Sequence, residues 1–129
     1  MNSELHTSQA RLLGVLALAA VERLGGDGVL FAAADDRLRE CKVVRVGDIA
    51  VVDQPADDSG PRTVSVYLIG EGAKFLLYSL QWHSAAPDLH LARDPRDWFG
   101  VVSMTLLDAL AKSDPALRAS LRACAAPPQ

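Results

Sequence analysis

The chain has 129 residues, a length typical of one domain, and its 50% hydrophobic and 22% charged residues exclude a chain that is disordered over most of its length. The net charge of −3 excludes the basic excess that binds nucleic-acid backbones, and two cysteines do not make a disulfide framework. We therefore expect one domain over residues 1–124, with a frayed tail over 125–129.

The first element is predicted as a helix over Ser3–Leu24, because leucines recur there at helical spacing. Its apolar run from Leu12 to Val21 also has the length of a signal peptide, and a secretion signal in residues 1–24 is the alternative. Glu4 stands where a signal carries positive charge, and the run continues directly into Glu22. These features favour a buried helix in a cytoplasmic protein. The run is too short to cross a membrane, so we expect no membrane partner.

The segment Val29–Cys41 fits a short helix or the start of a strand, and we favour the helix. From Lys42 to Val52 the apolar residues are mostly β-branched, which predicts strands. Gly47-Asp48, in their middle, fits either a two-residue hairpin turn or a bulge in one long strand.

A hairpin is predicted next, with strands over Thr63–Ile69 and Lys74–Trp82 around a turn centred on Glu71-Gly72. A symmetrical turn sets the register and so decides which side chains share a face. One face then carries Val64, Val66, Leu68, Phe75 and Leu77, and should be the core. The other carries Tyr67, Ile69, Leu76, Tyr78, Leu80 and Trp82.

Two helices are predicted at the C-terminal end, because Asp94-Pro95 and Asp114-Pro115 each combine an N-cap residue with a proline suited to the first turn. The first has a buried stripe of Phe99, Val102, Leu106, Ala109 and Leu110. The predicted fold is α+β: an antiparallel sheet of three to four strands flanked by an N-terminal helix and a C-terminal helical pair.

Motifs for catalysis, cofactors and metals are weak in this sequence. His83 and His90, with Asp88 between them, lack the helical spacing of a zinc site, and Gly70, Gly72 and Lys74 precede a strand where a phosphate loop requires a helix. We expect no catalytic, cofactor-binding or metal-binding residues and no cofactor. The alternative is a small enzyme with a site in the His83–Asp97 loop region.

The aromatic residues of the hairpin favour a non-catalytic protein-binding or assembly module instead. Tyrosine and tryptophan supply large contact areas with a polar end, and an exposed apolar face usually marks an interface. The expected partner is another protein or a second copy of the chain in a homodimer. The expected interaction residues are Tyr67, Leu76, Tyr78, Leu80 and Trp82.

Two resemblances accompany these predictions. The stretch GEGAKFLLYSLQWH over 70–83, followed by DPRDWFG over 94–100, resembles a small Burkholderia-type family of uncharacterised proteins. The resemblance implies a bacterial origin and carries no activity and no functional residues. In architecture the chain is similar to type III secretion chaperones, which are small acidic α+β proteins that hold partner segments on apolar patches, although further strands expected in that fold are lacking. A secretion-chaperone-like binder is therefore a further alternative.

Overall fold

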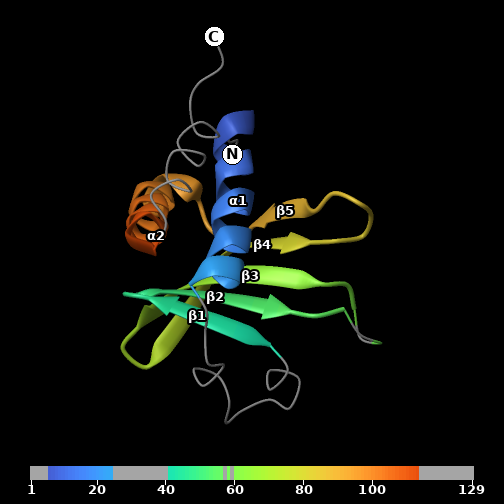
Figure 1. Ribbon diagram of the computed structural model, residues 1–129, viewed down its shortest axis with the longest axis horizontal. Helices are drawn as coiled ribbons and strands as arrows, with labels where there is room; N and C mark the ends of the chain where they lie inside the picture. The colour runs from blue at the N-terminus through green and yellow to red at the C-terminus, as the bar shows by residue number, and fades with distance from the viewer. Residues whose placement is uncertain (1–5, 25–40, 57, 59, 114–129) are drawn as a thin grey trace.

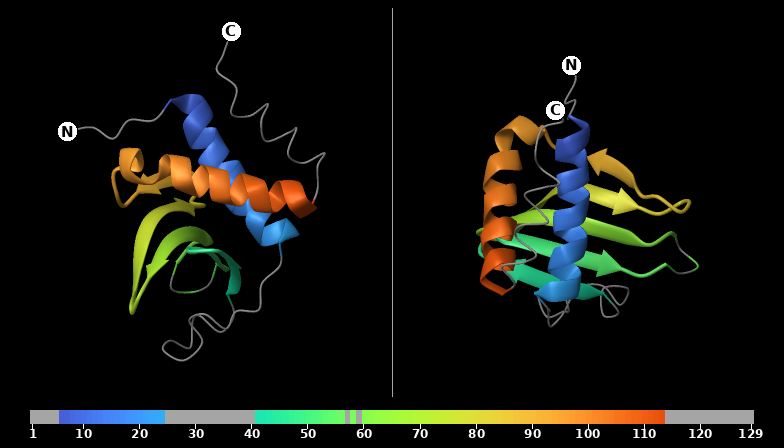
Figure 2. Two further views of the ribbon diagram at one scale, coloured as in Figure 1. Left: turned by 90° about the vertical axis from the view of Figure 1, so that its left-hand side faces the viewer. Right: turned by 45° about the horizontal axis from the view of Figure 1, so that its top comes forward.

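The structure, a computed structural model, describes residues 6–24, 41–56, 58 and 60–113. In this part of the chain one antiparallel sheet of five strands forms the first layer, and two long helices form the second. Figure 2 shows both helices on the same side of a strongly twisted sheet, and Figure 1 shows α1 crossing the strands while α2 lies beside it. The predicted α+β class with an antiparallel sheet is confirmed.

Helix α1 spans Thr7–Arg23, inside the predicted Ser3–Leu24. A capping box at His6 defines its start, where the backbone N–H of His6 donates to the side chain of Gln9 at 3.1 Å. Its buried residues recur at helical spacing and lie in the main core with α2 and the sheet: Leu12, Leu13, Leu16, Ala17, Ala19, Ala20 and Val21. The predicted buried N-terminal helix is therefore confirmed over these residues.

Strands β1 (Lys42–Val46) and β2 (Ile49–Gln54) form a hairpin. Val46 pairs with Ile49, so the loop contains only Gly47 and Asp48. Gly47 has a φ of 57°, a conformation that costs glycine little and other residues more. Of the two interpretations left open by the sequence, the hairpin turn is correct.

Strands β3 (Thr63–Gly70), β4 (Ala73–Gln81) and β5 (Asp88–Leu91) complete a meander in the order β1-β2-β3-β4-β5. The first two are the predicted hairpin. The sequence predicts a loop at Asp88–Leu91, and the structure shows the strand β5 there instead. The strand has the alternation of a half-buried edge, because Leu89 and Leu91 pack against the core while Asp88 and His90 are exposed.

A short 3-10 helix, η3 (Pro95–Asp97), precedes helix α2 (Phe99–Ser113). Asp94 caps η3 by accepting a hydrogen bond from the backbone N–H of Arg96 at 3.0 Å. The predicted cap is therefore real but belongs to η3, and α2 begins at Phe99. The second predicted C-terminal helix, from Asp114, lies outside the described residues. The segment Val29–Cys41, predicted as helix or strand, also lies outside them except for Cys41.

The main core lies between the helices and the sheet. It joins α1 and α2 to one face of the sheet through the fully buried side chains of Leu13, Leu16, Val51, Val64, Val66, Tyr78, Leu106 and Leu110. A smaller cluster on the opposite face contains Cys41, Val43 and Val52, with Tyr67 and Ile69 packed against it.

Candidate functional site

The five predicted interaction residues do not share one face of the sheet. Pairing of β4 with β3 follows the predicted register as far as Leu76, which lies opposite Tyr67. One residue later the register shifts, because Val66 pairs with Tyr78 and Leu77 is left without a partner on β3. A bulge of this kind exchanges the two faces for the rest of the strand. The predicted common face is therefore wrong.

Tyr78 and Leu80 lie in the core beneath α1. The Tyr78 side chain is fully buried, and its hydroxyl donates to the backbone carbonyl of Leu13 at 3.0 Å. Its ring stacks on Trp98 with centroids 5.3 Å apart. Burial raises the pKa of Tyr78 well above its usual range, because the ionised phenolate would lose its hydration there. Leu80 packs below Gly14 of α1.

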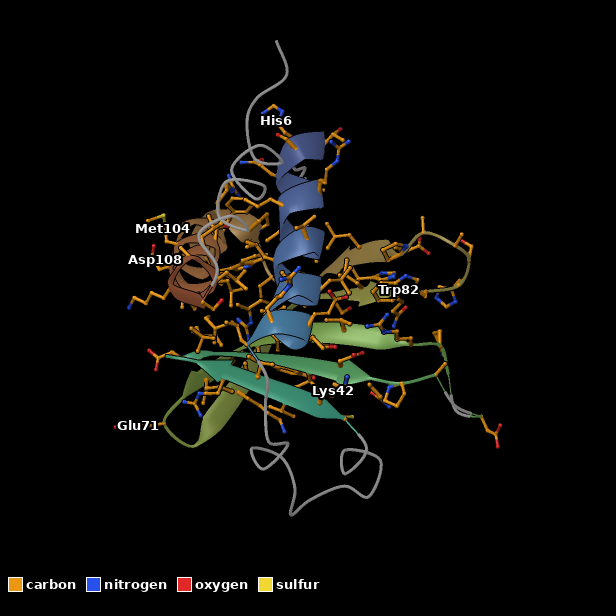
Figure 3. All side chains as sticks on the ribbon, in the orientation of Figure 1. His6, Lys42, Glu71, Trp82, Met104 and Asp108 are labelled. Atoms are coloured by element: carbon orange, nitrogen blue, oxygen red, sulfur yellow. The ribbon has the colours of Figure 1, made fainter. Side chains whose placement is uncertain are left out.

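Trp82 follows β4 on the same side of the sheet and is half-buried (Figure 3). The guanidinium carbon of Arg62 lies 4.8 Å from the centroid of the Trp82 ring. The same guanidinium donates to both carboxylate oxygens of Asp53, at 3.1 and 3.2 Å. This hydrogen bonding raises the pKa of Arg62 above its already high value, and the charge of Glu22 on α1 adds to the effect. The cluster joins the ends of β2, β3 and β4 and serves the fold.

Tyr67 and Leu76 remain on the opposite face of the sheet, where they lie directly across from each other. Leu76 is 37% exposed, while Tyr67 is half-buried against the smaller cluster. Two of the five predicted residues therefore stay together as neighbours, and whether any of the five contacts a partner stays a prediction.

In the His83–Asp97 region, the site of the enzyme alternative, most of the polar side chains lie at the surface. His83 and His90 are both exposed, and the Nε2 atom of His83 lies 3.3 Å from the side-chain oxygen of Gln81. Asp94 is engaged by Arg96, whose side chain and backbone N–H both donate to it, and these bonds lower the pKa of Asp94. Both groups are at the surface, so the pair does not resemble an activated carboxylate in a pocket.

Two further features, which concern metal ions and membranes, can be stated for the part of the chain that the structure describes. Among those residues, no three His, Cys, Asp or Glu side chains gather closely enough to hold an ion. No helix there has both the length and the apolar character needed to span a bilayer.

A different surface becomes visible in the structure. The exposed large apolar side chains of the described residues are Phe75 and Leu76 on β4 and Val101 and Met104 on α2. Figure 1 places α2 and the turn between β3 and β4 at the same end of the sheet, and the left view of Figure 2 shows both facing one side. Figure 3 marks this side with Met104 on α2 and Glu71 in the turn. We call these four side chains the end surface.

Sequence reasoning missed the end surface for two reasons. The pattern of the hairpin predicts Phe75 on the core face. It does not show how much of the ring the helices cover, and in the structure the ring is 40% exposed. Val101 and Met104 did give a signal, since both are large apolar residues outside the predicted buried stripe of their helix.

Strand β4 extends past the end of β5 near the end surface. Strand β5 pairs with β4 only over Tyr78–Gln81, so within the described residues no strand lies on the outer edge of Ala73–Leu76. The chain leaves the sheet at Arg93, whose guanidinium carbon lies 4.8 Å from the centroid of the Phe75 ring. An exposed cation therefore lies beside Phe75 of the end surface.

In comparisons with protein-family models, curated proteins and solved structures, no match to this chain is found. The functional interpretation therefore depends on the geometry described above.

Proposed function

We propose that this chain is a non-catalytic protein-binding module that holds a protein partner on the end surface. Its main support is the exposure of four large apolar side chains on two elements, α2 and the turn end of β4, which lie at the same end of the sheet; Val101 at 64% and Met104 at 59% are the most exposed. Single exposed apolar residues are ordinary, but several at one end of a molecule favour an interaction site. Methionine adds to this support, because its flexible side chain adapts to different partner surfaces.

The partner-binding role that the sequence predicts for the aromatic face of the hairpin is here proposed for the end surface. Tyr78 and Leu80 are occupied with packing under α1, whereas Leu76 belongs to both the predicted set and the end surface. A second copy of the chain is one partner that this surface could hold, and self-association is therefore one outcome of the test below.

We propose that the protein works in the cytoplasm. The residues that resemble a signal peptide lie in α1, where Leu13 and Leu16 are fully buried in the main core. Removing them by signal cleavage would uncover the sheet, which supports a protein that keeps this helix.

The test replaces Met104 or Phe75 by glutamate, with Ala85→Glu as the matched control. Ala85 is exposed in the loop between β4 and β5, so its variant adds the same charge away from the end surface. Partners are captured from native cytosol and identified by mass spectrometry, and self-association is measured by sedimentation equilibrium. We expect Met104→Glu and Phe75→Glu to weaken the interaction by about tenfold or more, as at central interface residues.

Circular dichroism and thermal unfolding establish that the three variants are folded equally well. If Met104→Glu and Phe75→Glu keep the partners and the oligomeric state of the Ala85→Glu control, the end surface is not the binding site.

A further inference from the structure

The outer face of α2 is an exposed stripe at helical spacing. It consists of Gly100, Val101, Met104, Asp108 and Lys112. Val101 and Met104 are the most exposed large apolar side chains of the described residues, at 64% and 59%. Among those residues, neither Asp108 nor Lys112 has an ion-pair partner. The outer face therefore has an apolar half near the start of the helix and a charged half near its end.

This stripe is complementary to itself when a second copy of the helix runs in the opposite direction. If two antiparallel α2 helices cross between Met104 and Thr105, positions equally distant from the crossing point face each other. Lys112 then lies beside Asp97 of the second copy, which is exposed immediately before α2. Asp108 lies beside the first turn of the second α2, which has no acidic residue of its own and whose free N–H groups favour a carboxylate. Two-fold symmetry forms each contact twice, once on either side of the apolar centre.

Gly100 adds a steric feature to the same arrangement. In the crossing described, Gly100 faces Ala109 of the second copy, so two small residues meet. A Cβ atom built on Gly100 would meet no described atom within 4 Å, which leaves this side of the helix open. Small residues at a helix contact allow the axes to approach to the shorter end of the usual range of about 8–10 Å. Met104, at the crossing point, has a flexible side chain that fills the remaining space.

We infer, on the basis of the protein-binding function proposed above, that the end surface binds a second copy of this chain through antiparallel packing of the two α2 helices. Val101 and Met104 form the apolar centre of the contact. Lys112 of each copy pairs with Asp97 of the other. Because α2 has 15 residues, about 22 Å of helix, the interface is smaller than the ~1,200 Å² of stable complexes. The dimer is therefore in exchange with the monomer, with a dissociation constant in the micromolar range.

Sedimentation equilibrium from micromolar to millimolar protein measures this dimer, and Gly100→Leu tests its packing. The added side chain enters open space in a single molecule, but it overpacks the contact with Ala109 of the second copy. We expect Gly100→Leu to weaken dimerisation by about tenfold or more. A surface that associates only by general apolar attraction would give the opposite result, because the substitution adds apolar area. Circular dichroism and thermal unfolding establish that the variant is folded.

Charge reversal tests the pairing of Lys112 with Asp97. Lys112→Glu is expected to weaken dimerisation by about tenfold, because two attractive contacts become repulsive. The double variant Asp97→Lys, Lys112→Glu exchanges the charges and should restore the dissociation constant of the wild type. The control Lys42→Glu makes the same change on β1, at a position that Figure 3 shows well away from Met104, and should leave dimerisation unchanged.

Disulfide trapping gives the direction of the helices. In a Cys124→Ala background the remaining native thiol is that of Cys41, which is buried. Under mild oxidation Met104→Cys should link two copies, because the two sulfur atoms meet near the two-fold axis. Lys112→Cys should not, because its two sulfur atoms lie at opposite ends of the contact. A parallel pair of helices would be linked by both variants.

The inference is overturned if the wild type stays monomeric at millimolar concentration, or if Gly100→Leu or Lys112→Glu dimerises as strongly as Lys42→Glu. It is also overturned if Lys112→Cys is trapped as readily as Met104→Cys. The broader function stands in those cases when Met104→Glu still loses a partner captured from cytosol. It fails separately when Met104→Glu keeps the partners and the oligomeric state of the Ala85→Glu control.

Discussion

Tyr78 connects the two layers of the molecule through a single hydroxyl. Replacing it by phenylalanine keeps the ring stacked on Trp98 but removes the hydrogen bond to the carbonyl of Leu13. We expect Tyr78→Phe to lower the free energy of unfolding by about 1 kcal/mol, measured by urea denaturation at neutral pH.

The same residue predicts a pH dependence. The pKa of Tyr78 is raised by burial, so its contribution to stability is complete below the pKa of an unfolded tyrosine, about 10, and is lost as the pH rises beyond it. Wild type should therefore lose stability above this pH more steeply than Tyr78→Phe. Parallel stability curves for the two proteins between neutral and alkaline pH would contradict the buried, protonated phenol.

Ser103 is a polar residue in an apolar place. It is 6% exposed within α2, and among the described residues its hydroxyl has no hydrogen-bond partner. Ser103→Ala should raise the free energy of unfolding by about 1 kcal/mol, because it removes an unsatisfied buried group. Ser113→Ala, on the same helix, is the control, since its hydroxyl donates to the carbonyl of Leu110 at 2.9 Å. Equal effects of the two substitutions would show that the Ser103 hydroxyl carries no burial cost.

At the scale of elements, two glycines predict opposite outcomes for one substitution. A methyl group on Gly14 would meet Leu80 at 3.8 Å, an ordinary contact, so Gly14→Ala should stabilise α1 by up to about 1 kcal/mol. Gly72, in the turn between β3 and β4, has a φ of 67°, and Gly72→Ala should destabilise the hairpin by about 1 kcal/mol or more. Thermal unfolding of both variants checks the signs, and destabilisation by Gly14→Ala would mean that α1 lies closer to β4 than described.

Much of the element structure could be predicted from local pattern, and the failures have a common cause. Helical spacing in α1, β-branched residues in β1 and β2, and the Asp94-Pro95 cap each act over a few neighbouring residues. The bulge at Leu77 does not, because it depends on which β4 side chains the helices can cover. That one-residue shift moved Tyr78 from the predicted interface into the core. The end surface was missed for the same reason, since exposure is decided by the packing of distant elements.

At the scale of the whole molecule, the connections explain why both helices cover one face. Each described strand is followed by its spatial neighbour in the sheet, so no helix is inserted between strands as a crossover. The helices of the described chain come before and after the meander, and they share its apolar face through Leu16 of α1 and Leu106 of α2. The result is a two-layer domain with its main core on the helix side.

This arrangement also affects how the protein is made. The ribosome produces α1 before the strands, whereas α2, which packs beside α1 over the same face of the sheet, emerges only after all five strands. At a synthesis rate of ~5–20 residues per second, the part of α1 that contacts α2 stays uncovered for several seconds after α1 is made, while β1, β2 and β3 can cover the rest earlier. The hairpins of the meander can form in microseconds once their residues are available, so sheet pairing does not limit assembly. A nascent chain of this protein is therefore expected to present the α2-contacting part of α1 to chaperones until α2 has left the ribosome.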